Sequence, residues 1–441
     1  MVSRQNSRIP RNIIILGIVS LLTDAATEMI YPLIPIFVAA LGSGALMLGV
    51  IEGVAETTAA LLKLVSGIIS DRMRRRKMLV VIGYTISSLI RPFTGLVANA
   101  WQIVVIRMLD RVGKGIRTAP RDALIALSVD QKIRGKAYGF HRAMDHTGAI
   151  IGPVLAIGTL IFLILALGMT DLVRVLRWTF ILALIPGLFA VFTLIVFLKE
   201  KNEDFDPDKK FRFSFRQFDR NFLAYLSVVL IFTLGNSSDA FMLFRVEEAI
   251  QASGAFYSII MKTPLLGDLV KRSADIQFQQ QLINILFLPL IWAFFHILKA
   301  VFSTPLGSWS DKIGRKTLIN IGWGIYALVY LSFALLDRLP VYWQVPATFI
   351  LFASYALYYA FCEGAEKALV ADIVKPDVLG SAFGMYNFTA GLAALPASVI
   401  FGILYNSFGA TIAFGSGACI ALVAMVLLTV LVQNKNSVTI Q

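Results

Sequence analysis

Apolar stretches of 20 or more residues follow one another along almost the whole chain, separated by short polar segments. A helix that spans a bilayer needs about 20 mainly apolar residues, and roughly twelve stretches meet this requirement. The predicted spans are 13–40, 46–69, 78–97, 101–127, 137–167, 177–198, 222–244, 282–306, 317–336, 345–369, 382–405 and 412–432. The pattern predicts an all-α membrane protein.

Lysine and arginine accumulate on one side of the membrane if these spans alternate in direction. The positive segments are Arg4 to Arg11, Arg72 to Lys77, Lys132 to Lys136, Lys199 to Arg220, Lys312 to Lys316, and Lys375. The connections near Gly42, Asn99 and Ser407 fall on the other side and carry no Lys or Arg. Basic loops stay in the cytoplasm, so we expect a multi-pass protein of the inner (plasma) membrane with both termini cytoplasmic.

The composition agrees with this class, because 57% of the residues are hydrophobic and only 15% are charged, with a mean hydropathy of +0.75. The 40 Lys and Arg exceed the 27 Asp and Glu, but they gather at the ends of apolar runs, which argues against a nucleic-acid partner. Cys362 and Cys419 lie inside apolar runs without metal-ligand spacing, so we expect neither a disulfide framework nor a zinc site.

The chain divides into two halves at its long polar segments. Residues 1–198 and 222–441 each hold half of the predicted spans, and residues 199–221 form a cytoplasmic linker. A second polar segment, residues 247–281, is expected as a periplasmic insertion folded as an amphipathic helix or loop.

Sequence repeats relate the two halves. Gly67-Ile-Ile-Ser-Asp71-Arg72-Met-Arg74-Arg75-Arg76 resembles Gly307-Ser-Trp-Ser-Asp311-Lys312-Ile-Gly314-Arg315-Lys316, each after the second span of its half. Ala123-Leu124 matches Ala368-Leu369, and Gly135-Lys-Ala-Tyr-Gly139 matches Gly380-Ser-Ala-Phe-Gly384. Parallel repeats are a known plan of transporters, with the binding site between them. We therefore expect two six-helix bundles around a central cavity.

At these residues the chain resembles the major facilitator superfamily of secondary transporters. The second-half loop fits the family's signature loop, and the first-half copy has Arg74 in place of a Gly. The resemblance implies that Asp71 and Arg75, with Asp311 and Arg315, form charge networks that latch the cytoplasmic ends. Asp122 is the expected partner of Arg75, because an Arg–carboxylate pair can break and form again.

Two further motifs resemble family patterns. Arg111-x-x-Lys114-Gly115-x-x-x-Ala119 is similar to a fourth-helix motif associated with proton coupling, with Lys114 and Arg117 at positions where Gln and Gly are usual. Gly148-x-x-x-Gly152-Pro153 in the fifth span is similar to a motif of exporters. The alternative for this motif is close helix packing by small residues with a bend at proline.

Charged residues inside the spans are the candidates for substrate and proton binding, because each costs roughly 2.5–3.5 kcal/mol to insert. Asp24 lies about 16 Å into the first span and shares a face with Thr27, Glu28 and Tyr31, so we expect this face to line the transport path. The alternative is a static ion pair of Asp24 or Glu28 with Arg107 or Arg111.

Other spans carry further candidates. The polar residues of the fourth span share a sector of about 140° on one helix. They are Arg107, Asp110, Arg111, Lys114, Arg117, Arg121 and Asp122. We expect the part up to Lys114 to neutralise acidic helices or bind an anionic substrate, and the part from Arg117 to belong to the gate.

The second span adds Glu52, Glu56 and Lys63 on one stripe, and the seventh adds Asp239 at a place analogous to Asp24. In the second span, pairing with neighbouring helices is the structural alternative. His141 and Asp145 in the fifth span form an i, i+4 pair that could exchange a proton. Closing the cytoplasmic helix end is the alternative for this pair. His141 and His146 do not share a face for a metal, so we expect no metal and no cofactor.

These features predict a monomeric, proton-coupled transporter that moves a small organic solute by alternating access. The fifth-span motif favours export, whereas the basic stripe favours an anionic substrate. The alternatives are an uptake permease for an anionic metabolite or siderophore and a non-transporting membrane sensor. A sensor requires a sizeable soluble signalling domain, and residues 199–221 are too short to supply one. The sequence lacks the nucleophile or metal cluster of a membrane enzyme, and Gly113-Lys114-Gly115 lacks the ATP-binding Walker pattern.

Overall fold

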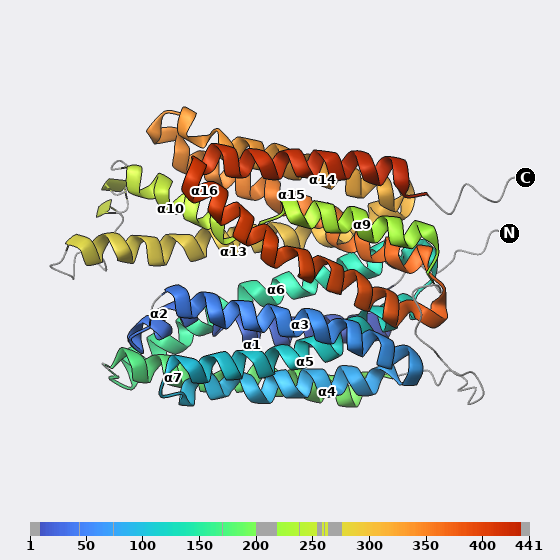
Figure 1. Ribbon diagram of the computed structural model, residues 1–441. Coiled ribbons are helices and arrows are strands. Elements are labelled where there is room, and N and C mark those ends of the chain that lie inside the picture. The colour runs from blue at the N-terminus through green and yellow to red at the C-terminus, as the bar shows by residue number, and fades with distance from the viewer. Residues whose placement is uncertain are drawn as a thin grey trace, which may run out of the picture.

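The computed structural model describes residues 9–43, 45–73, 75–169, 171–199, 218–237, 239–253, 258–259, 261–262 and 276–433. All the regular elements in these ranges are helices, as the sequence predicts. Figure 1 shows that their axes are roughly parallel and that they form a bundle. The predicted linker falls mainly on residues 200–217, which lie outside the described ranges.

The first half of the bundle comprises the helices up to α8. They are α1 (Arg11–Glu28), η1 (Tyr31–Leu33), α2 (Ile34–Ala40), α3 (Ala45–Met73), α4 (Arg76–Ile90), η2 (Arg91–Leu96), α5 (Ala100–Leu127), η3 (Gln131–Ile133), α6 (Arg134–Ile161), the π-helical η4 (Phe162–Ala166), α7 (Leu172–Leu182) and α8 (Leu184–Phe197).

The second half comprises the helices from α9 onward. They are α9 (Arg220–Gly235), α10 (Ala240–Ala252), α13 (Ile276–Ile313), α14 (Arg315–Ala334), η6 (Leu336–Arg338), α15 (Val341–Ile373), η7 (Pro376–Val378) and α16 (Leu379–Leu431).

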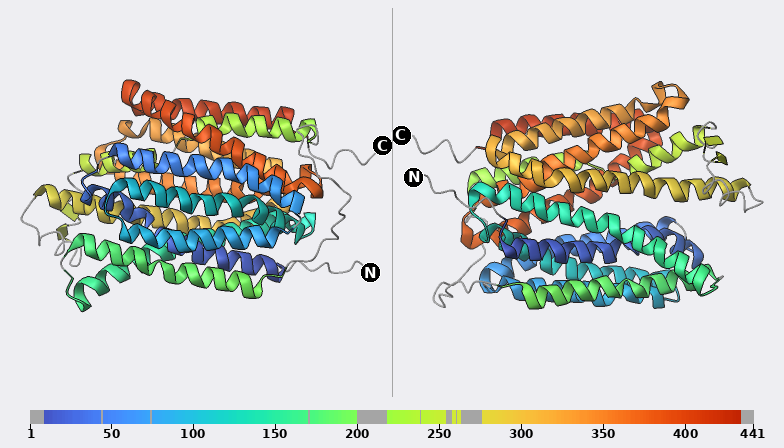
Figure 2. Two further views of the ribbon diagram at one scale, coloured as in Figure 1. Left: turned by 60° about the horizontal axis from the view of Figure 1, so that its bottom comes forward. Right: turned by 180° about the vertical axis from the view of Figure 1, so that it is seen from behind.

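The two halves lie side by side, the first in the lower part of Figure 1 and the second in the upper part. The most extensive contacts between them are those of α6 with α13 and of α3 with α16, and the views in Figure 2 show the same division. The helix α1 begins and α16 ends at the same end of the bundle, which we call the termini end.

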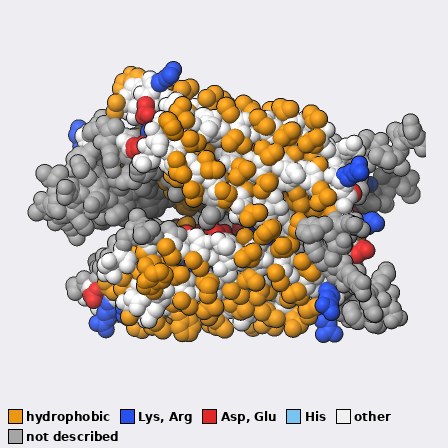
Figure 3. Space-filling model, in the orientation of Figure 1, with side chains coloured by type: hydrophobic (Ala, Val, Ile, Leu, Met, Phe, Trp, Pro, Cys, Tyr) orange, Lys and Arg blue, Asp and Glu red, His pale blue; other side chains and the backbone are white. Residues whose placement is uncertain are grey.

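The outer surface of the bundle is apolar, as Figure 3 shows in orange. Among the described residues, seven helical segments are long and apolar enough to cross a membrane. The helix α5 has a comparable length of 28 residues but carries seven charged side chains. Six of these charges are buried and Lys114 is half-buried, as expected for charge inside a membrane protein.

Several predicted spans are interrupted. The first is divided into α1, η1 and α2, the sixth into α7 and α8, and the seventh into α9 and α10. The last two predicted spans form one element, α16, that turns at Gly409. Gly409 has φ 82° and ψ 175°, a conformation that glycine adopts without steric cost because it has no Cβ.

The predicted polar insertion at residues 247–281 overlaps two helices. Its first residues belong to α10, which ends at Ala252, and its last residues begin α13 at Ile276. Residues 263–275, the centre of the segment, lie outside the described ranges.

Candidate functional site

Two aspartates connect the halves at the termini end. The carboxylate of Asp71 in α3 accepts hydrogen bonds from the backbone N–H groups of Gly380 (2.9 Å) and Ser381 (2.6 Å), at the start of α16. Asp311 in α13 accepts equivalent bonds from Gly135 (3.0 Å) and Lys136 (2.9 Å), at the start of α6. Each carboxylate therefore caps a helix of the opposite half, where free N–H groups and the helix dipole favour an anion.

Glycines allow these helices to approach. A Cβ atom on Gly67 would collide with the carbonyl oxygen of Gly380, and one on Gly135 would collide with that of Gly307. The repeated glycines found in the sequence are therefore positions where the backbones of the two halves touch.

The arginine beside Asp71 is Arg76, and the prediction of Arg75 is wrong by one position. The Arg76 side chain is buried and lies 3.5 Å from the Asp71 carboxylate, whereas Arg75 is exposed. Arg76 is the first residue of α4, as Arg315 is of α14. The second-half loop is one residue shorter because Gly314, at φ 95°, makes a tight turn.

Arg315 of the second-half loop contacts residues of both halves. Its guanidinium pairs with Asp311, lies 3.2 Å from a carboxylate oxygen of Asp372 and donates to the Gln131 carbonyl at 2.9 Å. Arg134 of the first half also binds Asp372, at 2.9 Å. Basic and acidic groups of both halves therefore close this end of the bundle.

The partner of Asp122 is Lys367 of α15, and the expected pair with Arg75 is absent from the described residues. The Lys367 ammonium lies 2.5 Å from one carboxylate oxygen, and Arg121 lies 3.1 Å from the other. Asp122 is completely buried. Lys367 was not among the residues predicted from the sequence to form the gate. Its charge inside the predicted span 345–369 was the signal that could have identified it.

The deeper charges of α5 are paired with carboxylates of neighbouring spans. Arg107 binds Glu52 at 2.8 Å, and Arg111 lies 3.4 Å from Glu56. Asp110 binds Arg91, in η2, at 2.9 Å. Ion pairs therefore connect α5 with α3 and with η2.

The alternative for Asp24 and Glu28 was a static ion pair with Arg107 or Arg111. Neither carboxylate forms an ion pair with another described residue, although Arg107 and Arg111 lie within electrostatic range of Glu28. Both side chains are half-buried. The static pair with Arg107 or Arg111 is therefore absent, because Glu52 and Glu56 occupy those guanidinium groups.

The predicted pair in α6 is present as part of a larger cluster. Asp145 lies 3.6 Å from His141 and 2.9 Å from Arg142, and its Oδ1 has no hydrogen-bond partner among the described residues. The next residue, His146, lies 2.9 Å from Glu363 of α15.

Glu363 joins both halves in the middle of the bundle, a role that sequence reasoning did not find. Besides His146, its carboxylate lies 3.5 Å from the Lys299 ammonium of α13. This ammonium also stacks on the Tyr359 ring, 3.6 Å from its centroid. The charges in the eighth and tenth spans were visible in the sequence, but their mutual positions were not.

Asp239 lies at the break between α9 and α10, whereas Asp24 lies inside a helix. Its carboxylate accepts hydrogen bonds from the hydroxyls of Tyr355 (2.6 Å) and Tyr359 (3.3 Å). Two tyrosines of α15 therefore hold this acid.

The glycine motif of α6 packs against α1 at the level of the unpaired acids. A Cβ atom on Gly148 would lie 3.0 Å from the Cβ of Asp24, and one on Gly152 would lie 2.6 Å from the Cβ of Glu28. Small residues permit this close contact between helices. The packing alternative for this motif agrees with these contacts.

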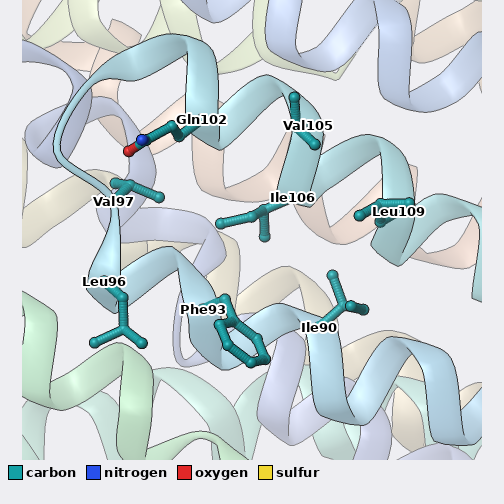
Figure 4. A pocket seen from close by; sticks show the side chains of 8 residues that line it. All are labelled: Ile90, Phe93, Leu96, Val97, Gln102, Val105, Ile106 and Leu109. Atoms are coloured by element: carbon teal, nitrogen blue, oxygen red, sulfur yellow. The ribbon is translucent and has the colours of Figure 1, made fainter.

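A separate apolar pocket of about 450 Å³ lies between α4, η2 and α5. Figure 4 shows its side chains, which are Ile90, Phe93, Leu96, Val97, Gln102, Val105, Ile106 and Leu109. Phe93, Val105 and Leu109 belong to the exposed apolar surface. The pocket therefore opens on the outside of the bundle, away from the charged interior.

Comparisons with known proteins identify relatives of this architecture. The profile of the Major Facilitator Superfamily matches residues 16–299 and 276–440. An MFS-type transporter of Methanocaldococcus jannaschii is 31% identical over 427 residues, which are 97% of this chain and 96% of that protein. The multidrug resistance protein MdtG of Proteus mirabilis is 27% identical over 88% of this chain and 84% of its own.

Two solved structures share the fold. The human organic anion transporter MFSD10 (TETRAN) superposes with a TM-score of 0.66 at 15% identity, over 96% of this chain and all of that one. The proton:xylose symporter XylE superposes with a TM-score of 0.61 at 16% identity, over 96% of this chain and 95% of that one. The sequence profile, the archaeal relative and the shared fold establish that the chain belongs to the Major Facilitator Superfamily.

Proposed function

We propose that this protein is a proton-coupled secondary transporter that exports a small organic solute across the inner membrane. The observation that carries the proposal is the pair of unpaired, half-buried carboxylates of Asp24 and Glu28 in the last two turns of α1. An acid inside a membrane protein that has no counterion is favoured when it binds a proton or a positively charged group.

The contacts at the termini end support alternating access. Asp71 and Asp311 hold the opposite half by hydrogen bonds to backbone N–H groups at helix starts, and Lys367 binds Asp122 across the same boundary. Such contacts can separate without unfolding either half. We assign this end to the cytoplasm because the basic loops lie there, and we assign residues 1–198 and 222–441 to the two moving bundles.

Export is preferred on the similarity to MdtG, which is named as a multidrug resistance protein. The second candidate is uptake of an anionic metabolite, favoured by the fold shared with an organic anion transporter. Fold similarity at this identity leaves the substrate open, because one fold hosts many functions.

The test uses purified protein in proteoliposomes. A thermal-shift screen with organic cations and anions first finds a ligand, and counterflow of that ligand then measures exchange without a proton gradient. We expect Asp24→Asn to retain counterflow and to lose accumulation driven by a pH gradient. The control is Asp377→Asn, which removes an exposed carboxylate in η7 and should change neither rate. Unchanged coupling in Asp24→Asn would remove Asp24 from the proton path.

A further inference from the structure

Acids and bases differ in accessibility on α1, α3, α5 and η2. The fully buried charges are mainly basic, namely Arg91, Arg107, Arg111, Arg117 and Arg121, with the acids Asp110 and Asp122. The accessible charges are mainly acidic, namely Asp24, Glu28, Glu52 and Glu56, with the bases Lys63 and Lys114. The charged face of α5 is positive in total, whereas the charges that are accessible to a solute are mainly negative.

The ion pairs show this separation within single contacts. The Arg107 side chain is 3% exposed and its partner Glu52 is 29% exposed. The Arg111 side chain is 8% exposed and its partner Glu56 is 55% exposed. In both pairs the carboxylate covers the guanidinium group and presents its own oxygen atoms outward.

One pair of the second half has the same arrangement, because Glu363 is partly accessible and its partner Lys299 is buried. Arg142 of α6, 4.0 Å from Glu363, is an accessible base beside this pair. On the face shown in Figure 3, acidic atoms are visible in the hollow between the halves, and no basic atoms are visible there.

A buried acid provides an independent observation. Asp145 of α6 is only 6% exposed, and its Oδ1 has no hydrogen-bond partner among the described residues. It lies one turn before Gly148, where α6 touches Asp24, and its charge interacts with that of Asp24. Its other carboxylate oxygen binds Arg142 at 2.9 Å and lies 3.6 Å from His141, so only Oδ1 has capacity for a further positive group.

We infer that the solute is an organic cation, held through its charge by Glu28 of α1 and Glu56 of α3. The inference rests on the proposed transport function and names its substrate class. It replaces the expectation of an anionic substrate drawn from the basic stripe, because those guanidinium groups are covered and paired. An anion that approaches these helices meets four accessible carboxylates, whereas the arginines are buried.

Lys114 is a positive side chain near these carboxylates, so its removal tests the inference in the opposite direction. Its side chain is half-buried on α5, it forms no ion pair with a described residue, and it lies within electrostatic range of Glu56. A resident ammonium group at this place repels a cationic solute and attracts an anionic one. Its removal should therefore change the affinities for the two classes in opposite directions.

The experiment measures equilibrium binding of two radiolabelled ions of the same shape and opposite charge, tetraphenylphosphonium and tetraphenylborate. The full-length protein is placed in phosphatidylcholine nanodiscs, and binding to empty nanodiscs is subtracted. We expect saturable binding of tetraphenylphosphonium, weakened about tenfold or more by Glu28→Gln or Glu56→Gln and strengthened a few-fold by Lys114→Gln. Asp377→Asn should have no effect.

Two results would overturn the inference. One is saturable binding of tetraphenylborate that Lys114→Gln weakens, which would make the site anionic. The other is an absence of tetraphenylphosphonium binding, or binding that Glu28→Gln and Glu56→Gln leave unchanged. Binding requires no transport, so either result leaves the counterflow test of the proposed function standing. Lys114→Gln is a gain-of-affinity variant, so misfolding cannot imitate its expected result.

Discussion

The Lys367 ammonium of α15 lies 2.5 Å from the Asp122 carboxylate of α5, and the two residues are 245 positions apart. The matched segments beginning at Gly135 and Gly380 have the same separation in the sequence. Asp122 and Lys367 are thus equivalent positions of the two repeats that face each other. Identical side chains would place like charges together, and the chain instead has opposite charges there.

Removing either member of this pair should have unequal effects. Lys367→Met leaves Asp122 with Arg121 at 3.1 Å, whereas Asp122→Asn leaves a buried lysine without a carboxylate. We expect Asp122→Asn to destabilise the protein by about 3–5 kcal/mol and Lys367→Met by less. Thermal unfolding in detergent measures both. The double variant should recover most of the loss, and strictly additive losses would contradict the pairing.

Gly67→Ala should hold the termini end open. The new methyl group would collide with the Gly380 carbonyl, so α3 and α16 must separate. Spin labels at the exposed positions Arg72 and Lys375, in a cysteine-free background, should report a longer distance. Gly53→Ala in the same helix meets no atom within 4 Å and serves as the control. Equal distances in the two variants would show that this contact does not limit closure.

Arg76 and Arg75 should differ in their effect on stability. Arg76→Ala removes the buried cation beside Asp71, and we expect a loss of about 3–5 kcal/mol. Arg75→Ala changes an exposed side chain and should stay within about 0.5 kcal/mol of the parent protein. Thermal unfolding of the two variants compares their stabilities. A larger effect of Arg75→Ala would show that Arg75, and not Arg76, is the equivalent of Arg315.

Gly152→Ala should weaken the contact between α6 and α1. Its Cβ would lie 2.6 Å from the Cβ of Glu28, and overpacking of this kind costs about 1–3 kcal/mol. Because the collision lies beside a proposed binding residue, transport should fall as well. Gly158→Ala, on the same helix with no neighbour within 4 Å, should be neutral or slightly stabilising. If Gly152→Ala changed neither stability nor transport, α1 would be able to move away from α6 at little cost in free energy.

The sequence predicted the class of fold because its signals are local. Length and apolarity of a segment decide whether it can span a bilayer, and most predicted spans overlap helices of the structure. The loops around Asp71 and Asp311 were recognised for the same reason, since the motif lies within a few consecutive residues. Helix breaks such as the one before Asp239 were missed because they interrupt an apolar run without changing its composition.

The residues that bind Asp71 and Asp122 required the tertiary structure. An extra residue in the first-half loop moves the buried cation from Arg75 to Arg76, and the path of the backbone around Gly314 determines this shift. Lys367 and Glu363 face the first half because α15 packs close to α5 and α6. Positions along one helix contain no information about which helix lies opposite.

The sequence by itself determined that α5 carries its charges on one side and that this side must avoid lipid. Only the tertiary structure decided which charges a solute can reach, because Glu52 and Glu56 of α3 cover Arg107 and Arg111. The helical period specifies the direction of a side chain, whereas accessibility depends on the atoms that neighbouring helices place in front of it. A stripe rich in arginine therefore lies beneath a surface of carboxylates.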